Sequence, residues 1–205
     1  DEDADGITNN RDNCYQIYNR SQQNYDSDIF GDICDSDDDS DGIIDMLDSC
    51  SQGELLWSSN NTTDHDGDGC KDSIEDDDDD SDSIQDISDA CPAGTLNWTS
   101  NSTTDYDTDG CKDSNEDLDD DDDTVNDTAD LCPKGELGWF STPSTDHDGD
   151  GCKDSNEDLD DDNDGIFDEY DTCYHGDLNW TSSNITDNDG DGCLDATEDM
   201  NDDND

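Results

Sequence analysis

The sequence predicts an elongated repeat array with little regular secondary structure, stabilised by disulfides and bound cations. Three observations lead to this prediction. The chain of 205 residues has 66 acidic and 6 basic residues, a formal net charge of −60 and only 25% hydrophobic residues. Its aspartates follow a strict register, and its ten cysteines are spaced in pairs. So low an apolar content does not support one ordinary core, whereas the register argues against disorder.

The strong negative charge limits the partners that we expect. Nucleic acids and anionic membranes carry the same sign and would be repelled, whereas multivalent cations would be attracted. The sequence has no apolar stretch long enough to span a bilayer or to form a signal-peptide core. We therefore expect Asp1 to begin a mature or excerpted segment. Residues 201–205 stop inside an acidic motif, so we expect the natural chain to continue.

The cysteines define the repeat. From Cys50 onward, alternate cysteines lie 41 residues apart, which indicates a 41-residue repeating unit. We divide the chain into a first unit at residues 1–49 and repeats at 50–90, 91–131, 132–172 and 173–205, the last of them truncated.

The spacing of the cysteines also favours one disulfide pairing. The two cysteines within each unit are always 20 positions apart, whereas the interval between units is 16 once and 21 thereafter. The constant interval is the better candidate for a closed loop, which would stabilise the fold by about 3 kcal/mol. Other connectivities stay open, and free or zinc-binding cysteines are disfavoured because no C-x-x-C pair exists. Disulfides imply a compartment outside the reducing cytosol. The favoured pairs are Cys14–Cys34, Cys50–Cys70, Cys91–Cys111, Cys132–Cys152 and Cys173–Cys193.

One type of acidic loop has the twelve-residue spacing of an EF-hand calcium loop. In residues 64–75, Asp64, Asp66 and Asp68 occupy positions 1, 3 and 5, Gly69 is at position 6 and Glu75 is at position 12. Alternate carboxylates converge on one hard cation, glycine allows the sharp turn, and position 12 completes the oxygen shell. We call this the first-type loop. Its predicted ligands are Asp64, Asp66, Asp68, Asp72 and Glu75; Asp105, Asp107, Asp109, Asp113 and Glu116; Asp146, Asp148, Asp150, Asp154 and Glu157; and Asp187, Asp189, Asp191, Asp195 and Glu198.

A second-type loop ends in aspartate and has an apolar residue at position 7. Gly42 and Gly165 hold position 6 in two copies, and Ser83 and Thr124 replace glycine in the other two, which we expect to strain or weaken those sites. Two further loops fit near the N-terminus, which gives ten loops. The predicted ligands are Asp37, Asp39, Asp41, Asp45 and Asp48; Asp78, Asp80, Asp82, Asp86 and Asp89; Asp119, Asp121, Asp123, Asp127 and Asp130; Asp160, Asp162, Asp164, Asp168 and Asp171; Asp1, Asp3, Asp5, Asn9 and Asp12; and Asn24, Asp26, Asp28, Asp32 and Asp35.

Calcium is the cation that this pattern favours. A solvated acidic tract is the simpler alternative, but a tract needs neither register nor glycine at position 6. Magnesium fits less well because it keeps its waters and rarely uses cages made only of protein oxygens. We expect one or two Ca²⁺ ions per loop, and we expect binding to drive folding of a chain that is otherwise expanded by self-repulsion. The loops lack flanking amphipathic helices, which argues against a helical calcium sensor.

Short apolar clusters and glycosylation sequons lie between the loops. Each cluster pairs a leucine with a tryptophan, and we favour a small core packed on the disulfide and the apolar position 7 over a platform for sugars. The tryptophans are Trp57, Trp98, Trp139 and Trp180. The sequons expected to accept N-glycans are Asn19, Asn60, Asn61, Asn97, Asn101, Asn179 and Asn184, with preference for the six around the tryptophans, whereas Asn126 lies inside a predicted loop.

The first unit resembles a thrombospondin type 3 repeat. The shared pattern in DNCYQIYNRSQQNYDSDIFGDICDSDDDSDGIIDMLDSC is DNC, downstream Asn and Gln, spaced aspartates, GD-x-CD and then DGI-x-D. The resemblance implies calcium-wrapped, disulfide-linked chain without regular secondary structure, secretion, and a role in a matrix or at a cell surface. Residues 50–205 keep the loop spacing but carry a Cys-Pro-x-Gly-x-Leu-x-Trp insertion, and they resemble secreted arrays of microbial surface proteins.

The sequence favours a structural function. A periodic array without a unique site suits a calcium-stabilised, glycosylated rod or fibre segment, with self-association as a further expectation. The alternatives are a calcium-dependent adhesion or glycan-binding module that uses the tryptophans, and a calcium buffer or mineral-surface modulator. An enzyme is disfavoured because the sequence has no nucleophile, phosphate or zinc-protease motif. His65 and His147 occupy loop position 2 and His175 is isolated, so we expect no catalytic residue.

Overall fold

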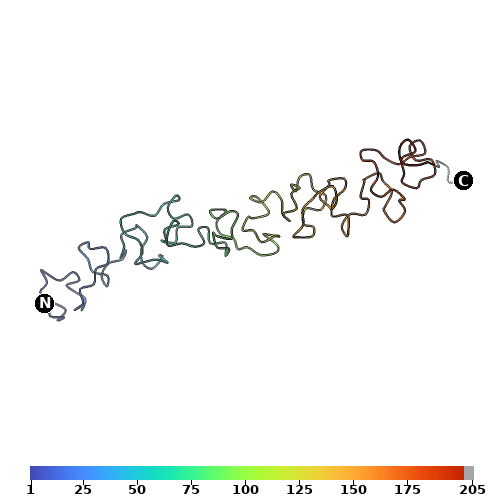
Figure 1. Ribbon diagram of the computed structural model, residues 1–205. Helices are drawn as coiled ribbons and strands as arrows, with labels where there is room; N and C mark the ends of the chain where they lie inside the picture. The colour runs from blue at the N-terminus through green and yellow to red at the C-terminus, as the bar shows by residue number, and fades with distance from the viewer. Residues whose placement is uncertain (201–205) are drawn as a thin grey trace. The chain divides into compact units, whose positions relative to one another are not determined.

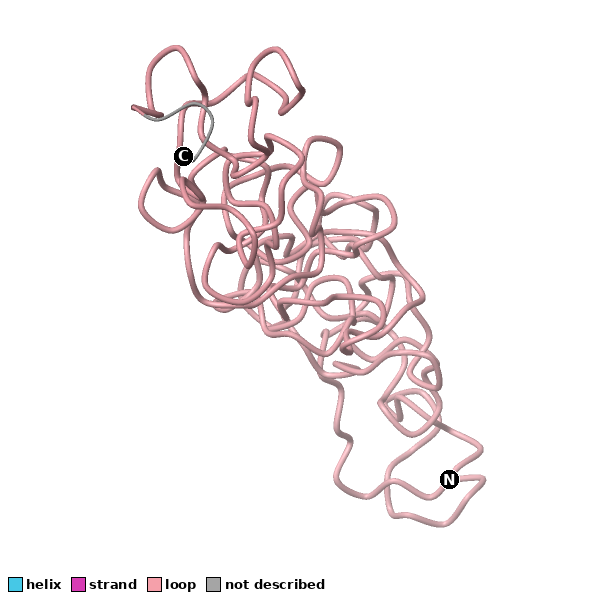
Figure 2. Cartoon of the chain, turned by 90° about the vertical axis from the view of Figure 1, so that its right-hand side faces the viewer, coloured by secondary structure: helices cyan, strands magenta, loops and turns pink. Residues whose placement is uncertain are grey.

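The chain is built from turns and bends. The computed structural model describes residues 1–200, and within them no residue belongs to a helix or a strand (Figures 1 and 2). Residues 201–205, which end the predicted fourth repeat, lie outside the described residues. The prediction of irregular structure is therefore confirmed for the part of the chain that is described. The physical reason is that carboxylates, rather than neighbouring backbone carbonyls, accept many of the backbone N–H groups.

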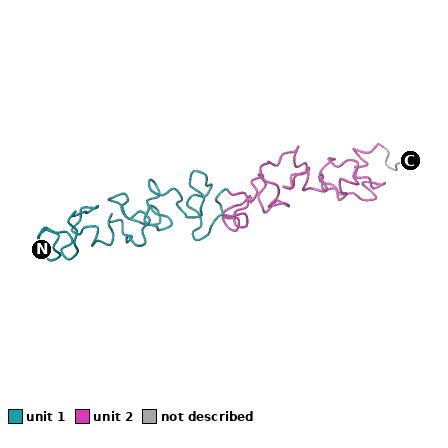
Figure 3. Cartoon of the chain, turned by 90° about the horizontal axis from the view of Figure 1, so that it is seen from below, with its two compact units in different colours: residues 1–100, 109–111 teal, residues 101–108, 112–205 magenta. Residues whose placement is uncertain are grey.

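Two compact units can be distinguished within the chain (Figure 3). The first consists of Asp1–Ser100 with Asp109–Cys111, and the second consists of Asn101–Thr108 with Lys112–Asp205. The boundary lies inside the second 41-residue repeat. The finer division predicted from the cysteines, into residues 1–49 and four repeats, remains a prediction.

Five disulfides cross-link the two units internally. Each closes an interval of 20 residues, with Cα–Cα distances between 5.1 and 5.8 Å, and no described cysteine is free. These are the pairs that the constant interval favours. The first compact unit contains Cys14–Cys34, Cys50–Cys70 and Cys91–Cys111. The second compact unit contains Cys132–Cys152 and Cys173–Cys193.

The interior consists of cysteines and aspartates instead of aliphatic side chains. The buried hydrophobic residues of the described chain are five cysteines and Trp139, whereas Met46 and Ile87 are about nine-tenths exposed. The aspartates at position 1 of the first-type loops and at positions 3 and 5 of the second-type loops are almost completely buried, among them Asp82, Asp123 and Asp164, each 0% exposed. Burying uncompensated carboxylates costs free energy. This interior is therefore suited to bound cations.

The leucine and tryptophan of the third 41-residue repeat differ in burial. Trp139 is 8% exposed, but Leu137 beside it is 44% exposed. Lysine ammonium groups lie over the indole faces. Lys153 Nζ, for example, lies 5.7 Å from the ring centre of Trp139. Lys71 lies over Trp57 in the same way, at 5.8 Å. Each of these contacts is a cation–π pair, which adds modestly to the packing.

Candidate metal centres

Backbone N–H groups orient the carboxylates of each loop. In the loop at residues 160–171, the Ile166 N–H donates to Asp164 Oδ1 at 2.7 Å, and the Asp164 N–H donates to Asp162 Oδ1 at 3.2 Å. The Gly165 N–H donates to Asp160 Oδ2 at 3.1 Å. Each aspartate thus uses one oxygen to fix the turn that follows it, as in an Asx turn. These hydrogen bonds fix the orientation of the side chains at positions 1, 3 and 5 within the loop.

At positions 1, 5 and 12 of this loop, the second carboxylate oxygen has no hydrogen-bond partner. In the same loop, Asp160 Oδ1, Asp164 Oδ2 and Asp171 Oδ2 are buried and unpaired. Buried polar atoms normally have partners, so a recurring unpaired set of anionic oxygens indicates ligands for a hard cation. The corresponding atoms of two other second-type loops are Asp37 Oδ1, Asp41 Oδ2, Asp48 Oδ2, Asp119 Oδ1, Asp123 Oδ2 and Asp130 Oδ2.

Carboxylate oxygens from positions 1, 3 and 5 lie within reach of one ion. Oxygens of Asp64, Asp66 and Asp68 all lie within 4.8 Å of one another. Similar groups form at Asp1, Asp3 and Asp5, at Asp37, Asp39 and Asp41, and, from positions 3, 5 and 12, at Asp26, Asp28 and Asp35. The described residues contain eight further groups that meet this criterion, besides a mixed one with His175. In these four loops the structure thus brings together three of the side chains that the twelve-residue spacing singled out.

The ion-free sites are electrostatically unfavourable. Burial raises the pKa of Asp171 to about 7, partly opposed by the Cys173 N–H, and Asp162 and Asp164 raise it further by repulsion. The pKa of Asp130 is raised to about 7, again mainly by burial. A divalent cation would remove both costs, because it replaces the lost solvation and neutralises the neighbouring charges. The free energy of binding is therefore coupled to the free energy of folding.

Position 9 has a bracing role that the ligand spacing did not predict. Its side-chain oxygen accepts the backbone N–H of position 2 in all ten loops, for example from Asp161 to Asp168 Oδ1 at 2.9 Å. Position 9 of an EF-hand loop often reaches its ion through water, which is compatible with this brace. The accepting residues are Asn9, Asp32, Asp45, Asp72, Asp86, Asp113, Asp127, Asp154, Asp168 and Asp195.

The aspartate that follows position 12 in the first-type loops is not among the ligands predicted from the spacing. Burial raises the pKa of Asp76 to about 6, partly opposed by the Asp78 N–H, and repulsion from Asp68 and Asp66 of that loop raises it further. Asp117 Oδ2 and Asp158 Oδ2 are likewise buried and without hydrogen-bond partners. These aspartates are further candidate ligands. The recurring Glu-Asp pair at the end of every first-type loop was the available signal.

A glycine after each repeat's first cysteine connects successive loops. The Gly176 N–H donates to Asp162 Oδ2 at 2.9 Å, and the next N–H, of Asp177, donates to Glu198 Oε1 at 2.6 Å. A Cβ atom at Gly176 would lie 2.7 and 2.8 Å from these two carboxylates, so only glycine fits. The equivalent bonds run from Gly53 to Asp39 at 2.9 Å and from Gly135 to Asp121 at 2.6 Å. The C-x-x-G motif thus ties position 3 of one loop to position 12 of the next.

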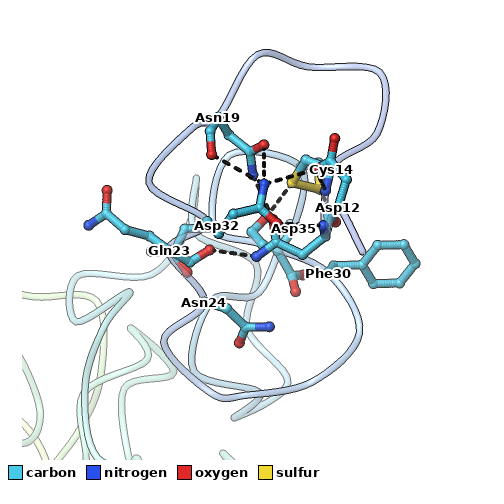
Figure 4. The surroundings of a disulfide bond; sticks show 12 residues. Asp12, Cys14, Asn19, Gln23, Asn24, Phe30, Asp32 and Asp35 are labelled. Carbon is cyan, nitrogen blue, oxygen red and sulfur yellow. Dashed lines mark hydrogen bonds between the residues drawn. A yellow bond between two sulfur atoms is a disulfide. The ribbon is translucent and has the colours of Figure 1, made fainter. Parts of the chain in front are cut away.

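The sequons differ in their accessibility. Asn19, which lies beside the Cys14 disulfide (Figure 4), is 8% exposed, and its amide contacts those of Asn13 and Gln22. This environment disfavours a glycan at Asn19. The six sequon asparagines around the tryptophans are all exposed, namely Asn60, Asn61, Asn97, Asn101, Asn179 and Asn184.

The loops, their unpaired oxygens and the five disulfides together define a disulfide-linked protein of acidic cation-binding loops. Comparison with known families matches the thrombospondin type 3 repeat at residues 1–22 and 24–53. No curated protein matches the chain at a significant level. The N-terminal region thus matches the thrombospondin type 3 repeat, and periodic disulfides and acidic clusters continue along the rest of the described chain.

Family and structure together define the general class of the protein. Thrombospondin type 3 repeats bind calcium, and the family is not catalytic. Multiple disulfides in such repeats indicate an extracellular calcium-binding repeat protein. Among the described residues, no helix has the length and apolarity needed to cross a membrane.

Proposed function

We propose that this chain is a calcium-stabilised structural spacer or fibre segment at a cell surface or in an extracellular matrix. Its predicted ligands are those of the ten loops, with one or two Ca²⁺ ions in each. Calcium would compensate the buried carboxylates, and the disulfides would hold the loops closed. The chain would then supply length and stiffness rather than a reaction.

The observation that carries this proposal is the short range of the bonds between loops. The Gly176–Asp162 bond spans 14 residues, the Asp177–Glu198 bond 21, and the bond between His147 and the Gly176 carbonyl 29. All three distances along the chain are shorter than one 41-residue repeat. Each loop is therefore tied to its neighbours, so that adding a repeat adds another link instead of enlarging a shared core.

Deleting one whole repeat tests the proposed spacer. We expect removal of residues 91–131 and removal of residues 132–172 to shorten the maximum dimension of the calcium-loaded protein by the same amount, because both deletions remove one equivalent link. Small-angle X-ray scattering in millimolar calcium measures this dimension. Unequal decrements, or a radius of gyration that scales as for a compact globule, would reject the spacer.

N-glycans and self-association belong to the same proposal. The six exposed sequon asparagines lie on segments between the loops, where a glycan could project without covering a loop. Glycopeptide mass spectrometry of the secreted protein identifies the occupied sites, and bare asparagine at all six would remove this part. Glycan binding through the tryptophans is less favoured, because Lys71 and Lys153 cover faces of Trp57 and Trp139.

A further inference from the structure

One residue in each repeat lies between two consecutive loops. It stands two positions after the first cysteine, and in three of the four repeats its side-chain nitrogen contacts two carboxylates. One carboxylate is position 9 of a loop, and the other is position 2 of the loop that follows. Gln52 Nε2 donates to Asp38 Oδ2 at 2.9 Å and to Asp32 Oδ2 at 3.5 Å.

The later repeats place different nitrogens at this junction. Lys134 Nζ contacts Asp113 Oδ2 and lies 3.3 Å from Asp120 Oδ2. His175 Nε2 lies 3.2 Å from Asp154 Oδ2 and 2.8 Å from Asp161 Oδ2. The equivalent residue in the remaining repeat is Ala93, which has no side-chain nitrogen.

Histidine changes the chemistry that is possible at this junction. The amide nitrogen of glutamine and the ammonium of lysine only donate hydrogen bonds, whereas a neutral imidazole nitrogen has a lone pair for a metal ion. One imidazole nitrogen with two carboxylate oxygens suits zinc and related transition metals, while calcium prefers oxygen ligands alone. His175 therefore distinguishes this junction from the ten calcium loops.

The geometry of the three ligand atoms fits a small metal ion. His175, Asp154 and Asp161 each offer one atom, and all three atoms lie within 4.8 Å of one another. A tetrahedral zinc ion with bonds near 2.0–2.1 Å separates its ligands by roughly 3.3 Å, close to the 2.8 and 3.2 Å that separate His175 Nε2 from the two carboxylates. Asp161 is only 4% exposed, and its other oxygen is buried without a hydrogen-bond partner.

Neighbouring rings hold the His175 imidazole in place. His147 stacks on it with ring centres 5.1 Å apart, and Tyr174 packs at 4.6 Å. His147 Nε2 is itself bonded to the Gly176 carbonyl at 2.9 Å, which keeps this ring in a bracing position. A cavity of about 320 Å³, lined in part by Thr145, Tyr174 and His175, opens beside the cluster and gives room for entry of the ion and for a fourth ligand such as water.

We propose that His175, Asp154 and Asp161 form a transition-metal site of the zinc class at this junction, separate in chemistry from the calcium loops. The ion would bridge the two carboxylates, as the side-chain nitrogens of Gln52 and Lys134 do at their junctions. It would thereby tie position 9 of one loop to position 2 of the next. The simpler arrangement is an ion pair between protonated His175 and the two carboxylates, which predicts no zinc binding.

The repeat itself supplies matched variants for the test. His175→Lys introduces the residue of the preceding repeat, and Lys134→His introduces the histidine between Asp113 and Asp120. Calcium stoichiometry, measured on the same samples, checks that both variants are folded. Zinc binding is then measured by isothermal titration calorimetry with zinc chloride in saturating calcium, and cupric ion as a second probe reports imidazole nitrogen through its electron paramagnetic resonance spectrum.

We expect one zinc equivalent in the natural chain, its loss or at least tenfold weakening in His175→Lys, and a second equivalent in Lys134→His. Nitrogen coupling to bound copper should disappear in His175→Lys. The proposal is overturned if the natural chain binds no zinc under these conditions. It is also overturned if His175→Lys binds zinc as the natural chain does, which would assign the binding to ligands other than His175.

Discussion

Replacing Asp123 with asparagine is expected to weaken the calcium affinity of its loop by at least about 100-fold, so that this loop no longer fills. The reason is that removing one partner from a buried charged assembly costs about 3–5 kcal/mol. Asp123 is completely buried, and its Oδ1 accepts the Val125 N–H at 2.7 Å. Its Oδ2 is buried without a hydrogen-bond partner. Asparagine keeps the shape but lowers the ligand charge, and an amide in its place can present N–H groups to the ion. Calorimetric titration with calcium measures the lost equivalent.

The neighbouring residue provides the control for this substitution. Asp122 is exposed, and the next repeat has Asn163 at the equivalent position. Asp122→Asn therefore makes the same change in net charge in the same loop without touching a buried oxygen. We expect the full calcium stoichiometry in this variant. Equal losses in the two variants would mean that overall charge, and not ligand geometry, governs calcium binding.

A second large effect is expected from Gly151→Ala. A Cβ atom at Gly151 would lie 2.2 Å from Oδ1 of Asp130, the position 12 residue of the preceding loop, so this carboxylate would have to move. The left-handed φ of 91° adds about 1–2 kcal/mol of strain for alanine. Because Asp130 Oδ1 also accepts the Cys132 N–H at 2.6 Å, the displacement should disturb two loops together. The calcium concentration needed for half-maximal amide protection should rise by more than tenfold.

Gly149→Ala separates the effect of backbone strain from that of the steric clash with a carboxylate. Gly149 has a similar φ of 78°, but a Cβ atom there would meet nothing within 4 Å. Alanine at this position should therefore incur only the backbone strain, and the shift in calcium dependence should be clearly smaller than for Gly151→Ala. Similar shifts in the two variants would show that the contact between Gly151 and Asp130 does not matter.

The local features of the fold could be predicted from the sequence because they depend on spacing along the chain. The 20-residue cysteine interval gave the disulfide pairs, since it stays constant while the interval between units changes. Alternate aspartates converge because turns of fixed length place positions 1, 3 and 5 on the same side. The lack of helices among residues 1–200 agrees with the absence of an apolar stripe at helical spacing.

Contacts between loops could not be derived in the same way. The spacing predicts position 9 as a ligand, but it does not show that an oxygen of this residue also braces position 2, as Asp154 does for the His147 N–H at 2.9 Å. His175 looked isolated because its partners, Asp154 and Asp161, lie 21 and 14 residues away along the chain. Such contacts depend on how one turn packs on the next. A comparison of Gln52, Lys134 and His175 as equivalent positions would have been the available signal.

Amide hydrogen exchange of the oxidised chain, in millimolar calcium and then in excess chelator, tests most directly whether calcium organises this fold. The N–H groups of Val125, Ile166 and Cys173 donate to carboxylates that are candidate ligands. We predict strong protection of these groups in calcium and its loss on chelation, although the disulfides remain closed. Equal protection in both conditions would contradict the account, because the loops would then be held by their disulfides and hydrogen bonds alone.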